Sequence, residues 1–580
     1  MDGQERNRDN QKERHIEQAS PGGTGADWHV DICQGIIMAY FLVIAFIYPL
    51  YAPGGYMRIG DVKYEFFRNV SLTTIAVMAA VILIAALCRR HSDWLIGHYR
   101  QMSVTDWFAY GYFVVVMLSY LCSGYKEEAL WGAEGWHMGA VTQMIFVMVY
   151  FLLSRYFHKN TGWIGVWLVA SAIVFVLGIC NRYSVYPIAM EGQTDTFIST
   201  LGNINWFCGY WSVAASVGIA LYWCGDRGWV RLLTGIYSAA AMLAGVTQGS
   251  KSAYLVFGVM CVGLFLMSLG NRVKQYRFLE LCMIFAAICQ FGRILRYVPG
   301  LDYNYGLETG DGGARITAAL LDSNVALWGF VIVILCYGLL RGLDRFIRVS
   351  DRFSAGSGAC VEKYRRRNAV IAGAIVILLG IAAGAWMLQS GIVQVREEID
   401  TVDMTADTAE EASDTIEAAG RPRIVFYEDW GNGRGAAWNC GIDAYRRMDF
   451  LHKLVGAGPD CFADYVYDVP KLAQKLADRF NNQRLTNAHN EQLTQLVNVG
   501  ALGLLCYMGI FLSAFLRCLR RADGQPVLYA CVFGILAYTA HGMVSFQQIL
   551  NTPYIFIVMG IGERYCRSMS AQAEDENMEI

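Results

Sequence analysis

The residue whose type and position best suit chemistry is His489. It lies in the segment Thr486–Leu493 (Thr-Asn-Ala-His-Asn-Glu-Gln-Leu), where a long polar stretch leads into an apolar one. At the start of a helix the positive end of the dipole disfavours protonation, and a neutral imidazole can accept a proton from a hydroxyl. The same residues also fit a plain helix start, in which Asn487 or Asn490 caps the helix and His489 is merely interfacial. A general base and a capping segment are therefore the two alternatives.

Four basic residues could accompany this histidine. Lys251 lies in the turn Gln248-Gly-Ser-Lys-Ser252, Arg434 and Arg447 lie in the polar stretch before His489, and Arg182 follows an apolar segment. Arginine forks and a lysine point charge suit a diphosphate at a membrane surface. Each of them taken singly also fits a solvated or snorkelling side chain, so the hypothesis requires that they converge.

Several kinds of chemistry have no motif in this sequence. There is no Walker A loop, no Asp-x-Asp pair for a metal-bound sugar nucleotide and no histidine pair with zincin spacing. We therefore expect no metal, no cofactor and no soluble nucleotide-activated donor. The net charge of −2 gives no indication of nucleic-acid binding. Ionisable residues are rare in the middles of the apolar segments, which weakens the case for an ion-coupled transporter.

The elements that must position these residues are membrane helices. The 580 residues are 55% hydrophobic and only 17% charged, and apolar runs of about 20 residues, long enough to cross a bilayer, recur throughout. We predict an all-α polytopic membrane protein with about fourteen transmembrane helices. The predicted spans are 31–50, 70–88, 106–122, 137–154, 161–180, 204–223, 231–247, 252–270, 277–291, 323–340, 369–388, 490–516, 526–544 and 552–566.

Lysine and arginine in the short loops fix the predicted orientation. Loops on one side hold 23 of them and the short loops on the other side hold nine. The richer side is expected to be cytoplasmic, with both termini there. The large loop 389–489 is then extracytoplasmic, and His489 is at its end. We expect any activity on that outer face.

This orientation divides the chain into five parts. Residues 1–30 read as a disordered cytoplasmic tail, 31–388 as transmembrane helices 1–11, 389–489 as the large loop, 490–566 as helices 12–14 and 567–580 as a second cytoplasmic tail. Within the loop, 397–420 is an acidic spacer and 421–489 a folded part with short amphipathic helices, one of them following Pro470. Cys440 and Cys461 fall in this folded part, and both a disulfide and two free thiols remain open.

Four short motifs in chain order resemble the O-antigen ligase and O-antigen polymerase (Wzy-type) family. They are Leu201-Gly-Asn-Ile-Asn205, Gln248-Gly-Ser-Lys-Ser252, Arg434-Gly-Ala-Ala-Trp438 with Gly456-Ala-Gly-Pro459, and Ala488-His-Asn490 with Val499-Gly-Ala-Leu-Gly503. The match covers roughly residues 180–565. The sequence departs from the family pattern at Ile204, which takes the place of a proline, and at Lys251, which takes the place of an arginine. A lysine neutralises charge but cannot make a bidentate fork.

The resemblance implies a fold like that of the GT-C membrane glycosyltransferases and an inverting transfer of a glycan from undecaprenyl diphosphate to an acceptor sugar hydroxyl. His489 would be the base. Lys251 and Arg434 would hold the diphosphate, with Arg447 and Arg182 as weaker candidates and Asn490 and Asn205 as further substrate contacts. The implied surroundings are the bacterial cytoplasmic membrane with its lipid, a lipid-linked donor and a glycan acceptor; a chain-length regulator is left open.

Three functions remain as alternatives. The number of predicted spans favours a polymerase of surface polysaccharide repeat units over a ligase that joins finished glycan to a lipid core, wall polymer or protein. A lipid-linked oligosaccharide transporter without chemistry is the alternative of another class. Only the polymerase and the ligase require His489 as a base.

Overall fold

Long apolar stretches form helices here because a helix satisfies its backbone hydrogen bonds within the segment, as a bilayer requires. The computed structural model describes residues 28–88, 102–194, 196–303, 312–351, 393–396 and 423–578. The first half of the chain forms α2 (Trp28–Leu42), the π-helical η1 (Val43–Ile47), α3 (Tyr48–Leu50), α4 (Ile59–Cys88), α6 (Val104–Cys122), α7 (Lys126–Trp131), α8 (Ala140–Tyr156), α9 (Thr161–Arg182), α10 (Ile204–Cys224), α11 (Gly228–Thr247), α12 (Lys251–Ser268) and α13 (Arg272–Leu295). The second half forms α14 (Gly312–Asp322), α15 (Val325–Asp351), α18 (Trp430–Arg447), α19 (Phe450–Val455), α20 (Phe462–Tyr467), α21 (Pro470–Arg479), α22 (Glu491–Arg520), α23 (Pro526–Gly542) and α24 (Thr552–Met578).

The chain is a multi-pass membrane protein. Within the described ranges ten helices are long and apolar enough to cross a membrane: Trp28–Leu50, Ile59–Cys88, Val104–Cys122, Thr161–Arg182, Ile204–Cys224, Gly228–Thr247, Lys251–Ser268, Arg272–Leu295, Val325–Gly342 and Glu491–Arg521. Two further predicted spans are the shorter apolar helices α8 and α23. The last predicted span, 552–566, forms the beginning of α24. The tail that we expected from residue 567 continues this helix to Met578. The predicted span 369–388, the acidic spacer and residues 1–27 of the predicted tail 1–30 lie outside the described residues, so the number fourteen stays a prediction. Residues 28–30, which we expected in that tail, begin helix α2.

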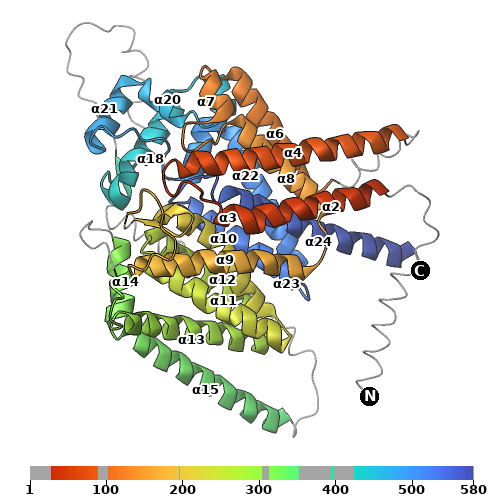
Figure 1. Ribbon diagram of the computed structural model, residues 1–580, viewed down its shortest axis with the longest axis vertical. Helices are drawn as coiled ribbons and strands as arrows, with labels where there is room; N and C mark the ends of the chain where they lie inside the picture. The colour runs from red at the N-terminus through yellow and green to blue at the C-terminus, as the bar shows by residue number, and fades with distance from the viewer. Residues whose placement is uncertain are drawn as a thin grey trace.

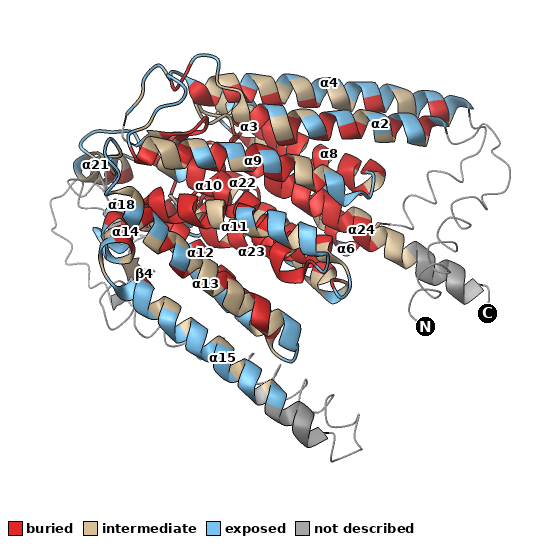
Figure 2. Ribbon diagram, turned by 60° about the horizontal axis from the view of Figure 1, so that its bottom comes forward, coloured by how far each residue is buried: buried red, intermediate tan, exposed pale blue. Residues whose placement is uncertain are grey.

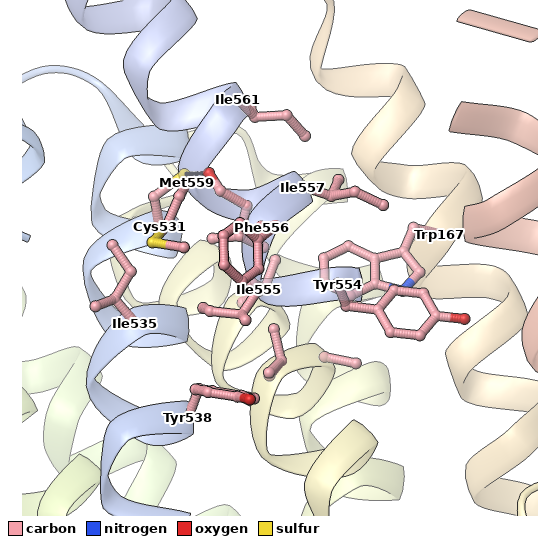
Figure 3. Close-up of a cluster of buried hydrophobic side chains, with 14 of the residues drawn as sticks. Trp167, Cys531, Ile535, Tyr538, Tyr554, Ile555, Phe556, Ile557, Met559 and Ile561 are labelled. Atoms are coloured by element: carbon pink, nitrogen blue, oxygen red, sulfur yellow. Dashed lines mark hydrogen bonds between the residues drawn. The ribbon is translucent and has the colours of Figure 1, made fainter. Parts of the chain in front are cut away.

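Helix α10 lies in the centre of the bundle and is buried along almost its whole length (Figure 2). Small residues let its neighbours approach closely: a Cβ on Gly218 would lie 2.0 Å from the Tyr237 ring of α11. Next to it, aromatic side chains of α9 and α24 interlock, with the Trp167 and Tyr554 rings stacked at a centroid distance of 5.8 Å (Figure 3). This packing makes the centre of the bundle a rigid frame.

The loops that we expected on the outer face meet at one end of the bundle. Figure 1 shows α18, α20 and α21 at this end, and the start of α2 and the end of α24 at the opposite end. Contacts between loops distant in sequence hold this end together: Tyr56 donates to the Ser199 carbonyl at 2.6 Å, Ala133 N–H to Asp460 at 2.9 Å, and Lys251 to Asn432 at 3.2 Å. We refer to it below as the loop end.

The folded part of the large loop covers the loop end with four short helices, α18 to α21. The predicted amphipathic helix after Pro470 is confirmed as α21, with Leu472 and Leu476 buried on one face. On its other side Lys475 pairs with Glu428 at 2.9 Å. Two short antiparallel strand pairs were not predicted: β1 (Phe197–Ile198) with β2 (Gly202–Asn203), and β3 (Val393–Arg396) with β4 (Arg423–Phe426).

A buried cluster of charges joins four helices near the opposite end. Arg517 of α22 binds Glu563 of α24 through two bonds of 2.9 and 3.0 Å, and Arg567 contacts both Glu563 and Asp106 of α6. Arg155 of α8 also reaches Asp106, at 3.3 Å. Because each buried charge has an opposite partner, the cluster fixes these helices relative to one another.

Candidate functional site

His489 occupies a strained backbone position immediately before α22. Its φ is +50°, in the left-handed region that side chains other than glycine seldom adopt. The preceding Asn487 accepts a hydrogen bond from His489 N–H at 2.9 Å, and Asn490 caps α22 by accepting from Leu493 N–H at 2.9 Å. Such strain costs of order 1–3 kcal/mol and is typical of sites where geometry serves function. The capping interpretation is therefore right for Asn490, whereas His489 is held in a conformation that capping does not require.

A break in α22 fixes the direction of its first two turns. Gly500 is non-helical inside the helix, with φ 70° and ψ −175°. The freed carbonyls of Val497 and Asn498 accept hydrogen bonds from the N–H groups of Ala457 and Gly458, both at 2.9 Å. A helix broken at membrane depth needs such replacement donors.

Glycine is required on both sides of this contact. A Cβ on Gly456 would lie 2.2 Å from the Asn498 carbonyl oxygen, and one on Gly500 would lie 2.4 Å from the carbonyl group of Leu454. The two motifs Gly456-Ala-Gly-Pro459 and Val499-Gly500 thus form one backbone-to-backbone contact. This contact positions the first half of α22 and, with it, His489.

The His489 ring is partly buried against an aromatic wall. It packs edge-on against Phe546 at a centroid distance of 5.3 Å, and within the part of the chain that the structure describes its ring nitrogens form no hydrogen bond. Phe546 in turn packs edge-on against Trp136, and Trp136 packs edge-on against Trp206. Burial first, and then the positive charge of Arg434, lower the pKa of His489 to about 4. The imidazole is consequently neutral at pH 7, as expected. The causes are burial and the charge of Arg434, whereas the expectation rested on the helix dipole.

Lys251 and Arg434 converge on one tight turn. Residues 431–433, at the start of α18, all have positive φ (65°, 63° and 87°). Lys251, at the first position of α12, donates to Asn432 Oδ1 at 3.2 Å, and Arg434 Nη1 donates to the Gly431 carbonyl at 3.0 Å. The turn therefore brings together two cations 183 residues apart in sequence, one of which acts electrostatically on His489.

Arg182 and Asn205 lie around the turn that precedes Lys251. Arg182 is 5% exposed; its Nε donates to the Thr247 carbonyl at 2.9 Å and its guanidinium lies over the Tyr303 ring. Asn205 accepts a hydrogen bond from Ser250 Oγ at 2.9 Å. Both residues support the turn that presents Lys251.

Two predicted site residues have other surroundings. Arg447 is exposed at the far end of α18, about 20 Å along the helix from Arg434 at 1.5 Å per residue, so the structure does not bring it to the turn. Asn490 has both ends of its amide in use within the fold, since its Nδ2 also donates to the Met543 carbonyl at 3.0 Å. In the large loop, Cys440 and Cys461 are both buried free thiols.

A small polar cavity beside His489 was not predicted. Its volume is about 20 Å³, room for about one water molecule. The residues that line it are Trp136, Met138, Asp460, Thr486, Asn487, Glu491, Thr494, Gln495, Asn498, Phe546 and Gln547. Positions 491, 494, 495 and 498 share one face of α22, so a polar stripe in an otherwise apolar helix was the sequence signal.

A buried hydrogen-bond network extends from this cavity. Gln547 accepts from both Gln143 and Gln495 at 2.7 Å and donates to the Tyr507 hydroxyl at 2.8 Å. Tyr507 in turn donates to the buried Glu491 carboxylate. Intramembrane ionisable residues with such partners usually mark functional regions. The network supports α22 directly behind His489.

A scan against protein-family models returns no match for this sequence, and neither does a search of curated proteins. The case for a function therefore depends on the residues of the site and on the motifs that contain them.

Proposed function

We propose that this protein is a membrane glycosyltransferase of the O-antigen ligase and polymerase type. It would transfer a glycan from undecaprenyl diphosphate to the hydroxyl of an acceptor sugar at the extracytoplasmic face of a bacterial cytoplasmic membrane. The observation that supports the proposal most is the linkage of three residues: Lys251 and Arg434 both donate hydrogen bonds to the 431–433 turn, and the charge of Arg434 acts on His489.

In the proposed reaction His489 accepts the proton of the acceptor hydroxyl as its oxygen attacks the anomeric carbon. The bond between that carbon and the diphosphate oxygen breaks with inversion, and undecaprenyl diphosphate leaves. Lys251 and Arg434 neutralise the negative charge that grows on the diphosphate, which is the kind of stabilisation that contributes most to such transfers. No metal is required for this charge balance.

Binding of the donor would also make His489 a stronger base. In the free protein burial and Arg434 keep the pKa of His489 at about 4, too low for an effective proton acceptor near pH 7. A diphosphate between Arg434 and Lys251 brings negative charge next to the imidazole, and a nearby opposite charge favours the protonated form. The pKa of His489 therefore rises when the donor is present, which couples proton transfer to the presence of substrate.

The architecture proposed for this activity is the GT-C-like one, with fourteen spans and with both termini in the cytoplasm. Within this class we propose a polymerase of surface polysaccharide repeat units. Deletion of the gene should then leave single repeat units on the acceptor lipid. Glycans that reach normal length in the deletion strain but stay unattached to their final acceptor would show a ligase.

Charge substitutions at Lys251 test the diphosphate role. Lys251→Arg should retain transfer, whereas Lys251→Glu should weaken donor binding by roughly 10- to 100-fold, because a hydrogen bond to a charged group is worth about 1.5–3 kcal/mol. The control is Lys471→Glu, the same charge change on the exposed surface of α21. Donor affinity measured with the purified protein decides the outcome. Equal affinity of the Lys251→Glu and Lys471→Glu variants would remove Lys251 from the site.

A further inference from the structure

A second, larger cleft lies at the end of the bundle remote from His489. It has a volume of about 570 Å³ and is lined by Arg231, Arg272, Val273, Tyr276, Arg277, Glu280, Arg341 and Asp344. Arg231 lies near the start of α11. The end of this helix, at Thr247, is about 24 Å from Arg231 at 1.5 Å per residue and leads to Lys251. The cleft is therefore separate from the candidate site, and the proposed transfer reaction does not use it.

Three helices form this cleft. α13 supplies Arg272, Tyr276 and Glu280, which are four residues apart and share a face. α11 supplies Arg231, and the end of α15 supplies Arg341. From their junction with α14, α13 and α15 diverge toward the cleft in both views (Figures 1 and 2). The cleft is lined by the start of α13 and the end of α15, which remain in contact there through Tyr276 and Asp344.

The charge in the cleft is positive. Four arginines and two carboxylates line it. Arg231 pairs with Glu280 at 2.9 Å and Arg272 with Asp344 at 3.2 Å. Arg277 pairs with Asp226, whose side chain is 90% exposed, at 3.2 Å. The lining thus has an excess of positive charge that the wall itself does not neutralise.

Arg341 is the cation best placed to bind a ligand. Its guanidinium lies 4.1 Å from the centre of the Tyr276 ring and donates to the Tyr337 hydroxyl at 3.0 Å, but it forms no ion pair with a described residue. Within the wall, the Nε groups of Arg231 and Arg277 also find no acceptor among the described residues. A guanidinium that is stacked on an aromatic ring can still donate two parallel hydrogen bonds to the oxygens of a phosphate.

The surroundings of the cleft are apolar and exposed. Val273 in the lining is 54% exposed, and Leu335 and Leu339 on α15 are 60% and 75% exposed. A free phosphate ion would gain nothing from these side chains, whereas the acyl chains of a lipid would cover them. Basic pockets between membrane helices are a recurrent kind of anionic headgroup site.

We propose that this cleft binds the phosphate of an anionic phospholipid, such as phosphatidylglycerol, from the leaflet on that side of the membrane. Arg341 and Arg272 contact the phosphate, and an acyl chain lies along Val273 and the exposed side of α15. Because α15 is buried over only 6% of its apolar window, the lipid would join this helix to the rest of the bundle.

The test uses the full chain, purified and returned to vesicles of phosphatidylcholine alone or with about one-fifth phosphatidylglycerol. We expect phosphatidylglycerol to raise the melting temperature and to remain bound in native mass spectra. Arg341→Gln should weaken its binding about fivefold, the value of one basic residue near a membrane surface, and Arg341→Lys should retain most of it. Arg58→Gln is the matched control, because Arg58 is 73% exposed and lies at the loop end.

Four results would overturn this assignment. Equal retention of phosphatidylcholine and phosphatidylglycerol, or an Arg341→Gln variant that behaves like Arg58→Gln, would exclude an anionic lipid site. Stabilisation by inorganic phosphate as large as that by phosphatidylglycerol would show a site for free phosphoanions instead. Stabilisation by polyglutamate but not by phosphatidylglycerol would show a site for an acidic protein segment.

Discussion

Replacing Gly500 with alanine should detach the first half of α22 from the turn that holds it. The new Cβ would lie 2.4 Å from the Leu454 carbonyl group and 2.5 Å from Val455 N, backbone atoms that cannot rotate away. The backbone conformation alone costs about 1–3 kcal/mol. Separating the two segments would also break the bonds from Ala457 and Gly458, worth about 1 kcal/mol each. The expected loss of stability is about 3–5 kcal/mol.

Gly524→Ala is the matched control for this substitution. Gly524 has a similar φ of 75°, but a Cβ there would meet nothing within 4 Å, so only the backbone cost of about 1–2 kcal/mol applies. Melting temperature in detergent compares the two variants, and hydrogen exchange shows whether the amides of the Gly456–Gly458 turn lose protection. If Gly500→Ala were no less stable than Gly524→Ala, or left these amides protected, the contact would not hold the helix.

Two predictions concern pH. If donor binding raises the pKa of His489 from about 4, the acid limb of kcat/KM, which reports the free protein, should lie at lower pH than the acid limb of kcat; coincident limbs near pH 6.5 would contradict this. Burial raises the pKa of Asp460 from its ordinary value of about 4 to about 7, although the N–H groups of Met138 and Ala133 oppose the shift. Because its folded-state pKa is raised, Asp460 should cost stability as the pH rises from about 4 through 7. Asp460→Asn can accept the same two N–H bonds. The melting temperature of this variant, measured relative to that of the wild type, should therefore rise between pH 5 and pH 8; a relative melting temperature that falls over this range would refute the prediction.

Much of the helical framework could be predicted from the sequence because it follows from local patterns. Apolar length predicts the membrane helices, and the spacing of Leu472 and Leu476 predicts the buried face of α21. The alternation of the predicted spans predicts which loops share a face, and those loops contact one another. The predicted span 277–291 is part of the 24-residue helix α13.

The site itself depends on contacts that no local pattern contains. The break at Gly500 occurs in a sequence that is helical on both sides, and it makes sense only with the Gly456 turn against it. Lys251 meets Asn432 across 181 residues, whereas Arg447 is kept apart by the length of one helix. The cavity beside His489 could have been found, because Glu491, Gln495 and Asn498 repeat at helical spacing.

The most direct test of the central claim is glycan transfer by the purified protein in vesicles supplied with an undecaprenyl-diphosphate-linked repeat unit. The wild type should lengthen the glycan, and His489→Ala should insert and melt normally but give no transfer. His452→Ala is the control, since this histidine of the same loop is bonded to Asp449 at 2.8 Å in α19 and should transfer like the wild type. Undiminished transfer by His489→Ala would contradict the proposed site.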